Sequence, residues 1–156
     1  MLALGRWCHW HHCCQQICSN ARSLYGMSDT SALTVLGQTV HHAIAHVEVF
    51  PAPAHVSSVT FTTDELSSIC PVTQQPDIAT VVIEYEPNEF CIESKSLKLY
   101  LWGFRDRAVF AEALAAEIAA EVMETAKPYA VRVHLTQRPR GGIEVSAVAE
   151  MFSDAE

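Results

Sequence analysis

The chain has 156 residues, 49% of them hydrophobic, which predicts a single domain with a modest core. Its formal net charge of −8 argues against a nucleic-acid partner, because backbone-phosphate binding depends mainly on Lys and Arg. The sequence contains no apolar run of the roughly 18 residues that a membrane span needs, so we expect a soluble, cytoplasmic protein that acts on a small molecule.

The first 26 residues differ from the rest. They hold four of the six cysteines and no acidic residue, so they contribute +2 to the net charge and leave −10 for the remainder. Their Cys and His spacing lacks the paired knuckles of a zinc finger, and they lack the apolar region of a signal peptide. We expect residues 1–26 to be a disordered or non-native extension, with Met27 as a possible true start. Adventitious metal binding is the alternative. Residues 27–156 would form one domain.

Extended structure is predicted over residues 40–53, and alternation predicts a strand over 56–63. A loop is expected to begin at Asp64 and to continue past Pro71 and Pro76, since proline opposes helix formation. The clearest strand is residues 78–87, which are rich in β-branched side chains. A brief return over residues 89–95 leads into a short helix or turn over 96–105.

Asp106 is a candidate N-cap for a long helix that ends near Lys127, before a proline. This helix carries an apolar stripe and, on its other face, three glutamates. The stripe is Phe110, Leu114, Ile118 and Val122, and the glutamates are Glu117, Glu121 and Glu124. Strands over 129–137 and 143–151 follow, joined by a turn in which Gly141 and Gly142 can take positive φ.

This order predicts an α+β fold, a four-stranded antiparallel sheet with helices on one face. The exposed edges of such a sheet favour association with further subunits.

Cys70 is the main candidate for chemistry. It lies beside a proline in a predicted loop, where a thiolate could act as a nucleophile, although a lone cysteine is also a common small core residue. With Cys91 it fits a reducing compartment. Asp77, seven residues later, is either a proton donor or a turn residue.

Charged side chains suggest where ligands bind. Lys95 and Lys98 would share a helix face, either as solvated residues or, with Arg140 on a glycine turn, as an anion site. Glu112, early in the long helix, could hold the N–H groups of a base or lie on the surface.

Two segments, SSICPVTQQPDIATVVIEYEP and ESKSLKLYLWGFR, resemble the short, single-module form of the 7-cyano-7-deazaguanine reductases. The likeness runs from about residue 61 to 143, and the ESKSLKLY motif distinguishes these reductases from related pterin cyclohydrolases. The resemblance implies an NADPH-dependent nitrile reductase of queuosine biosynthesis, hence of transfer RNA modification. It also implies a tunnelling fold that assembles into stacked rings, a homo-oligomeric decamer of two pentamers with sites shared between subunits, and no resident metal.

The resemblance also implies roles for individual residues. Cys70 would add to the nitrile and form a covalent thioimide, and Asp77 would be the proton donor. The substrate would be bound by Ile92, Glu93, Ser94, Ala111 and Glu112, and the NADPH phosphates by Lys95, Lys98 and Arg140. Addition of a thiolate divides a difficult reduction into easier steps, and two NADPH would be consumed for each primary amine formed.

One position departs from the family pattern, because the usual Phe-His-Glu run is Phe110-Ala111-Glu112 here. Three alternatives to the reductase remain. A relative that adds ammonia to the nitrile would keep Cys70 and Asp77 but would not need the ESKSLK segment. A non-catalytic deazapurine-binding oligomer is the second alternative. A zinc cyclohydrolase is the third, although the histidines after Met27 lack ligand spacing.

Overall fold

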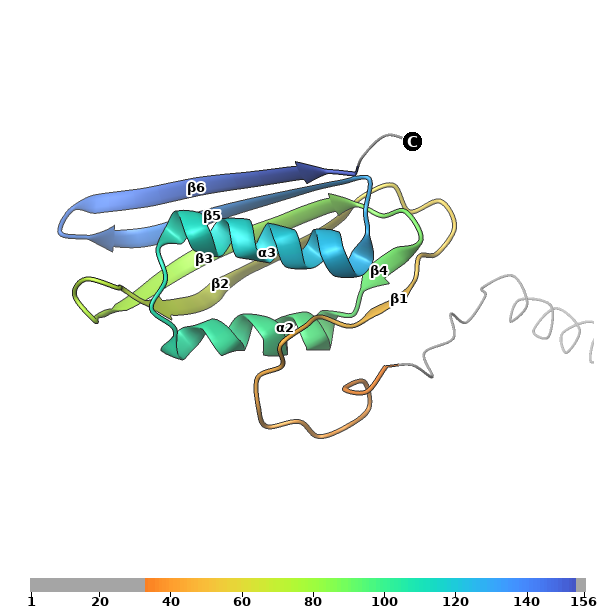
Figure 1. Cartoon of the computed structure of the whole chain (residues 1–156), viewed down its shortest axis with the longest axis horizontal. Coiled ribbons are helices and arrows are strands. Elements are labelled where there is room, and N and C mark those ends of the chain that lie inside the picture. Colours follow the sequence, from red (N-terminus) through yellow and green to blue (C-terminus); the bar gives the residue numbers. More distant parts are fainter. Residues whose placement is uncertain (1–32, 154–156) are drawn as a thin grey trace, which may run out of the picture.

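The structure is a computed structural model that describes residues 33–153. The expectations about residues 1–26 and about a start at Met27 lie outside these residues. Within them the chain forms two α-helices, one 3₁₀-helix and six strands (Figure 1). In chain order these are β1 (Val49–Pro51), β2 (Val59–Ile69), β3 (Pro76–Glu86), β4 (Phe90–Ile92), α2 (Ser94–Trp102), η1 (Gly103–Asp106), α3 (Ala111–Ala126), β5 (Ala130–Arg140) and β6 (Ile143–Phe152). None of the helices in this part of the chain is long and apolar enough to cross a membrane.

The main sheet is antiparallel with the strand order β2-β3-β5-β6, which confirms the predicted α+β class and four-stranded sheet. A second, two-stranded sheet pairs β1 with β4 and was not predicted. The glycine turn was predicted correctly, because Gly141 and Gly142 have φ of 63° and 82° between β5 and β6. Such angles cost a glycine little, since it has no Cβ.

Two predicted boundaries were wrong. The loop expected from Asp64 begins only at Cys70, because β2 resumes its pairing with β3 after an irregularity between Thr63 and Leu66. Extended structure expected over 40–53 is limited to β1, and the residues before it are held by side chains rather than by a strand partner.

The long helix begins later than predicted. Asp106 is not its N-cap but ends η1 and pairs with Arg105, and Phe110 is at the N-cap position of α3. The intervening residues are extended because they bond to the end of β2. Ile69 N donates to Arg107 O at 2.8 Å, and Val109 N donates to Ile69 O at 3.1 Å. This pairing brings the start of α3 next to Cys70.

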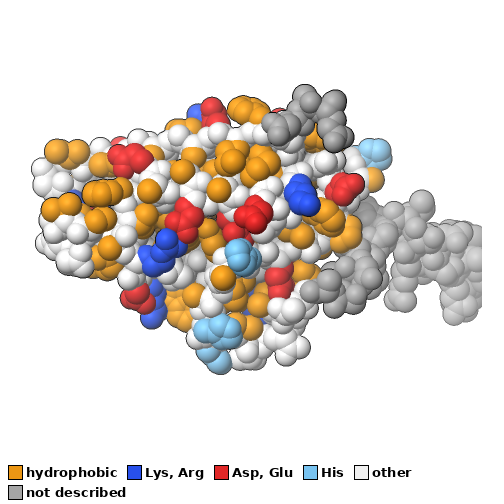
Figure 2. Space-filling model, in the orientation of Figure 1, with side chains coloured by type: hydrophobic (Ala, Val, Ile, Leu, Met, Phe, Trp, Pro, Cys, Tyr) orange, Lys and Arg blue, Asp and Glu red, His pale blue; other side chains and the backbone are white. Residues whose placement is uncertain are grey.

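Helix α3 covers β5 and β6, and α2 runs beside it near β2 on the same face of the sheet (Figure 1). Leu114, Ile118 and Val122 are buried as predicted, whereas Phe110 is 56% exposed because it precedes the first helical turn. Figure 2 shows acidic side chains over α3 in the middle of this face.

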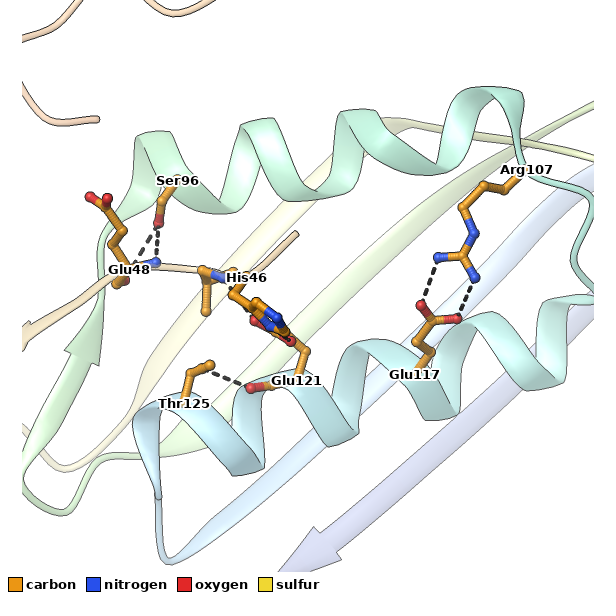
Figure 3. Close-up of polar contacts among 8 residues, drawn as sticks. His46, Glu48, Ser96, Arg107, Glu117, Glu121 and Thr125 are labelled. Carbon is orange, nitrogen blue, oxygen red and sulfur yellow. Dashed lines mark hydrogen bonds and ion pairs between the residues drawn. The ribbon is translucent and has the colours of Figure 1, made fainter. Parts of the chain in front are cut away.

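Glu121 was expected on the solvent face of α3 but is buried. Its carboxylate accepts from Val47 N at 2.8 Å and lies 3.1 Å from His46 Nδ1 (Figure 3). The next residue, Glu48, donates its amide to Ser96 Oγ on α2 at 2.8 Å. Residues 46–48 therefore connect α3 to α2. The contacts with His46 and Val47 give the buried Glu121 carboxylate the hydrogen bonds that it needs.

The other face of the main sheet lies open in the described residues. Ile78 and Val148 on this face are 41% and 48% exposed, and Arg132 pairs with Glu150 across β5 and β6. At the end of β6, Phe152 is 72% exposed. The chain thus presents apolar side chains and two edge strands, β2 and β6, to its surroundings.

Candidate functional site

Cys70 opens the tight connection between β2 and β3. Its amide donates to Gln75 O at 2.9 Å, and its carbonyl accepts from Gln74 N at 3.0 Å. Gln74 takes a φ of 57°, which lets the chain reverse before Pro76 begins β3. Proline is tolerated there because it is the first residue of the strand. The Cys70 side chain is 8% exposed, so a short, well-bonded loop fixes the sulfur close beneath the surface.

Arg140 joins this loop to Asp77. Its Nη1 donates to Thr73 Oγ1 at 2.7 Å and to Gln75 Oε1 at 2.8 Å, and its Nη2 lies 3.0 Å from Asp77 Oδ1. The Asp77 side chain is only 10% exposed. Arg140 ends β5, so the β5–β6 turn lies at the same end of the fold as the β2–β3 turn (Figure 1).

The surroundings of Cys70 favour the thiolate. The pKa of the thiol is lowered from 9.0 to about 6, first by hydrogen bonding from the Thr73 side chain and then from Arg140, with the backbone at Thr73 and Val72 adding to the effect. A thiol with such a pKa is largely ionised at neutral pH, and the thiolate is the nucleophilic form. Buried Cys91 shows the opposite behaviour, because desolvation raises the pKa of its thiol.

This difference predicts the pH dependence of alkylation. Since the folded-state pKa of Cys70 is lowered, its thiolate is present above about pH 6 and is lost as the pH falls through that value. Iodoacetamide labelling of Cys70, followed by peptide mass spectrometry, should reach half its maximal rate near pH 6. A midpoint in the ordinary range of about 8 to 9 for cysteine would contradict the site geometry.

The start of α3 lies at the same end of the fold. Residues 107–109 pair with Ile69, which precedes Cys70 in the chain. Ala111 and Glu112 come shortly after this paired segment. Ala111 is buried at 3% exposure, and Glu112 is exposed. The structure thus gathers Cys70, Asp77, Arg140 and the first turn of α3, which are spread over 71 positions of the sequence.

Ile92, Glu93 and Ser94 lie at the opposite end of the fold, where α2 begins (Figure 1). Ile92 is buried and donates its amide to the Tyr85 hydroxyl at 2.9 Å. Glu93 is the N-cap of α2, and its carboxylate accepts from Lys95 N at 2.8 Å and Ser96 N at 2.7 Å. This is the bond pattern by which a side chain satisfies the free amides at a helix start.

The two lysines have different surroundings. Lys95 Nζ donates to Val35 O at 2.6 Å and also to Gln38 O, so it holds the segment before β1. Lys98 is exposed. Neither lysine shares a contact with Arg140, so within one chain the structure does not assemble the phosphate patch proposed from the sequence.

A groove of about 430 Å³ separates α2 from β2 and β3. Its walls are mostly apolar, with Phe61, Leu66 and Trp102 among the residues lining it, and its polar lining includes Ser94, Lys98 and Glu65. Among the described residues, no three His, Cys, Asp or Glu side chains are grouped so as to hold a metal ion.

Two residues that hold Arg140 in place, Thr73 and Gln75, were not among the residues expected at the site. The signal for Thr73 was its spacing of three residues from Cys70 in a proline-containing loop. No local pattern linked either residue to Arg140, which is 67 positions from Thr73 and is brought to it only by sheet pairing.

The antiparallel α+β fold, with a thiol of lowered pKa in a loop fastened to an Arg–Asp pair, defines a candidate cysteine site. A sequence profile described as "QueF-like protein" matches residues 76–156, and the chain belongs to this family. The NADPH-dependent 7-cyano-7-deazaguanine reductase of Nitratidesulfovibrio vulgaris (strain DP4) is 41% identical over 107 residues, which are 69% of this chain and 64% of that protein. The match therefore spans less than two thirds of that relative.

Other relatives give similar results. The protein of the same name from Granulibacter bethesdensis is 39% identical over 121 residues, covering 74% of this chain and 79% of that protein. Among solved structures, an archaeosine synthase QueF-Like in the apo form is similar with a TM-score of 0.58 and 28% identity. The similarity covers 61% of this chain and 93% of that one.

Proposed function

We propose that the protein is an NADPH-dependent nitrile reductase that converts 7-cyano-7-deazaguanine to 7-aminomethyl-7-deazaguanine, a step of queuosine biosynthesis in the cytoplasm. The observation that carries the proposal is the thiolate-favouring loop at Cys70 beside Asp77 and Arg140. The names of the relatives, at 38–44% identity, support the substrate and the cofactor.

In the proposed mechanism the Cys70 thiolate attacks the electrophilic nitrile carbon and forms a C–S bond. A π bond of the nitrile breaks, and its electron pair moves to nitrogen, where a proton that solvent supplies through the Asp77 carboxylate completes a thioimide. The tight loop around Cys70 orients the sulfur, and its low exposure keeps water away from the adduct. When bound, NADPH supplies hydride, and the four-electron reduction to a primary amine consumes two equivalents.

Residues at both ends of the fold fit the ligands. Ser94 and Lys98 border a groove with apolar walls, a surface suited to a dinucleotide with a charged phosphate. Glu112 is exposed on the first turn of α3, beside the segment that pairs with β2, where its carboxylate would accept from the N–H groups of the base. Ala111 has no polar side chain, so the alanine leaves this position without the imidazole typical of the family.

The separation of residues 92–95 from Cys70 supports a site shared between subunits. The length of α2, about 13 Å, separates the N-terminus of this helix from the end of the fold that holds Cys70 (Figure 1). This separation is greater than the length of a bicyclic base. We therefore propose that a second copy brings its residues 92–95 to Cys70, in a ring-shaped homo-oligomer. The open sheet face, the edge strands and exposed Phe152 support this assembly.

Two assays test the function. Oxidation of NADPH should require 7-cyano-7-deazaguanine, and intact-protein mass spectrometry with the nitrile alone should show a covalent adduct that maps to Cys70. Tight nitrile binding without an adduct or NADPH oxidation would instead indicate a binding protein.

A second candidate function is addition of ammonia to the nitrile, which the structural similarity to an archaeosine synthase favours. It would use Cys70 and Asp77 without NADPH. An ammonia-dependent amidine product, formed while NADPH stays unoxidised, would establish this function and exclude the reductase.

Deletion of residues 1–26 is expected to leave turnover and assembly unchanged. The core, both groups of site residues and the edge strands all lie within residues 33–153. Steady-state kinetics and light scattering on the full chain and the truncated chain check this. Loss of the oligomer after truncation would show that the amino-terminal segment takes part in assembly.

A further inference from the structure

We infer that Arg140 positions and activates the Cys70 nucleophile: its guanidinium fastens the Cys70 loop to Asp77 and holds the sulfur as a thiolate. This role differs from binding NADPH phosphate. The inference deepens the proposed function, since it concerns the same site.

The contacts of Arg140 carry the inference. One guanidinium nitrogen bonds to two side chains of the six-residue loop, Thr73 Oγ1 and Gln75 Oε1, while the other pairs with Asp77 on β3. The planar fork of an arginine suits such a bridge, because its donors diverge in fixed directions. The loop that begins with Cys70, β3 and β5 are thus joined by one side chain.

The position of Arg140 makes phosphate binding within the same chain less suitable. Its side chain is 40% exposed and already faces one carboxylate and two neutral oxygens. A phosphate would have to compete with Asp77 for the same charge. Lys98, in contrast, borders the groove beside α2.

The charged groups near the Cys70 loop come from β3, β5, the segment that pairs with Ile69, and α3. Asp77 on β3 and Arg140 on β5 form an ion pair. On the segment that pairs with Ile69, the Arg107 guanidinium is engaged by Glu117 at 2.6 Å (Figure 3), and Glu112 is exposed on the first turn of α3. Because Arg140 bonds to the Cys70 loop itself, it is the cation placed to stabilise the thiolate, and it adds to the hydrogen bonding from Thr73 that lowers the pKa of Cys70 most.

The experiment measures alkylation of Cys70 by iodoacetamide as a function of pH, with peptide mass spectrometry, in the full chain without nitrile or NADPH. Arg140→Ala removes the second-largest cause of the lowered pKa of Cys70 and releases Thr73, the largest, so it is expected to raise the midpoint from about 6 toward about 8.5. Labelling near neutral pH should then fall by roughly tenfold or more. Arg140→Lys keeps the charge without the fork and should give an intermediate midpoint.

Arg138→Ala is the matched control, because Arg138 lies on the same strand but faces Asp64 at 3.9 Å. It should leave the midpoint unchanged. The inference is overturned if the alkylation midpoint of Arg140→Ala equals that of the unmodified chain. It is also overturned if the variant only binds NADPH more weakly. If Arg140→Ala does not fold, as judged by circular dichroism, the Arg140→Lys midpoint decides. The labelling requires no substrate, so failure of the proposed reaction would appear separately, as absence of the nitrile adduct.

Discussion

Replacement of Cys70 by alanine is expected to abolish NADPH oxidation and the covalent nitrile adduct together. The sulfur is the atom that bonds to the nitrile carbon in the proposed mechanism, and alanine offers no nucleophile. Because the side chain is small, the loop bonds of the Cys70 backbone to Gln74 and Gln75 should persist. Intact-protein mass spectrometry and a continuous NADPH assay provide the two measurements.

The matched control is Cys91→Ala, which removes the other cysteine of the described residues. Cys91 is buried on β4 at 4% exposure, outside the Cys70 loop. This variant should keep both the adduct and turnover. Turnover that survives in Cys70→Ala would exclude a covalent thioimide mechanism.

Replacement of Glu93 by alanine is expected to destabilise the fold in addition to any effect on ligand binding. Its carboxylate satisfies two backbone amides at the start of α2, and loss of an N-cap side chain costs about 0.5–2 kcal/mol. Leaving the Ser96 amide buried without its acceptor adds to this cost. Urea unfolding should show a lower midpoint for Glu93→Ala.

Glu93→Asp separates the two roles of the residue. Aspartate is a preferred N-cap, so this variant should regain most of the free energy of unfolding. A substrate contact that depends on the longer side chain would remain impaired, seen as a raised KM. If Glu93→Ala unfolds at the same urea concentration as the unmodified chain, the capping bonds contribute little to stability.

The sequence supported the fold well because its signals were local. The β-branched run near residue 80, the alanine-rich helix and the Gly141-Gly142 turn each favour one conformation by their own chemistry. The errors occurred where distant segments override local preference. Asp106 has the features of an N-cap, but pairing of residues 107–109 with Ile69 delays the helix by one turn.

In the candidate site too, some features follow from local sequence and others from contacts between distant segments. Cys70 and Asp77 are close in sequence, and Pro71 already indicated that the thiol lies in a turn. Glu93 and Lys95 were chosen as ligand contacts from a motif. The bonds of Glu93 to the start of α2 are local capping bonds, whereas the bonds of Lys95 to residues 35 and 38 depend on packing.

The sequence by itself determined the fold class and the strands and helices of the sheet layer, and it made Cys70 the candidate nucleophile. Only the tertiary structure decided which charged groups surround that thiol. Antiparallel pairing of β3 with β5 brings Arg140 to Asp77 across 63 positions, and no local pattern encodes such a contact. Arg140, assigned from sequence to a phosphate, therefore bonds to the Cys70 loop and to Asp77, and we infer that its positive charge there stabilises a thiolate.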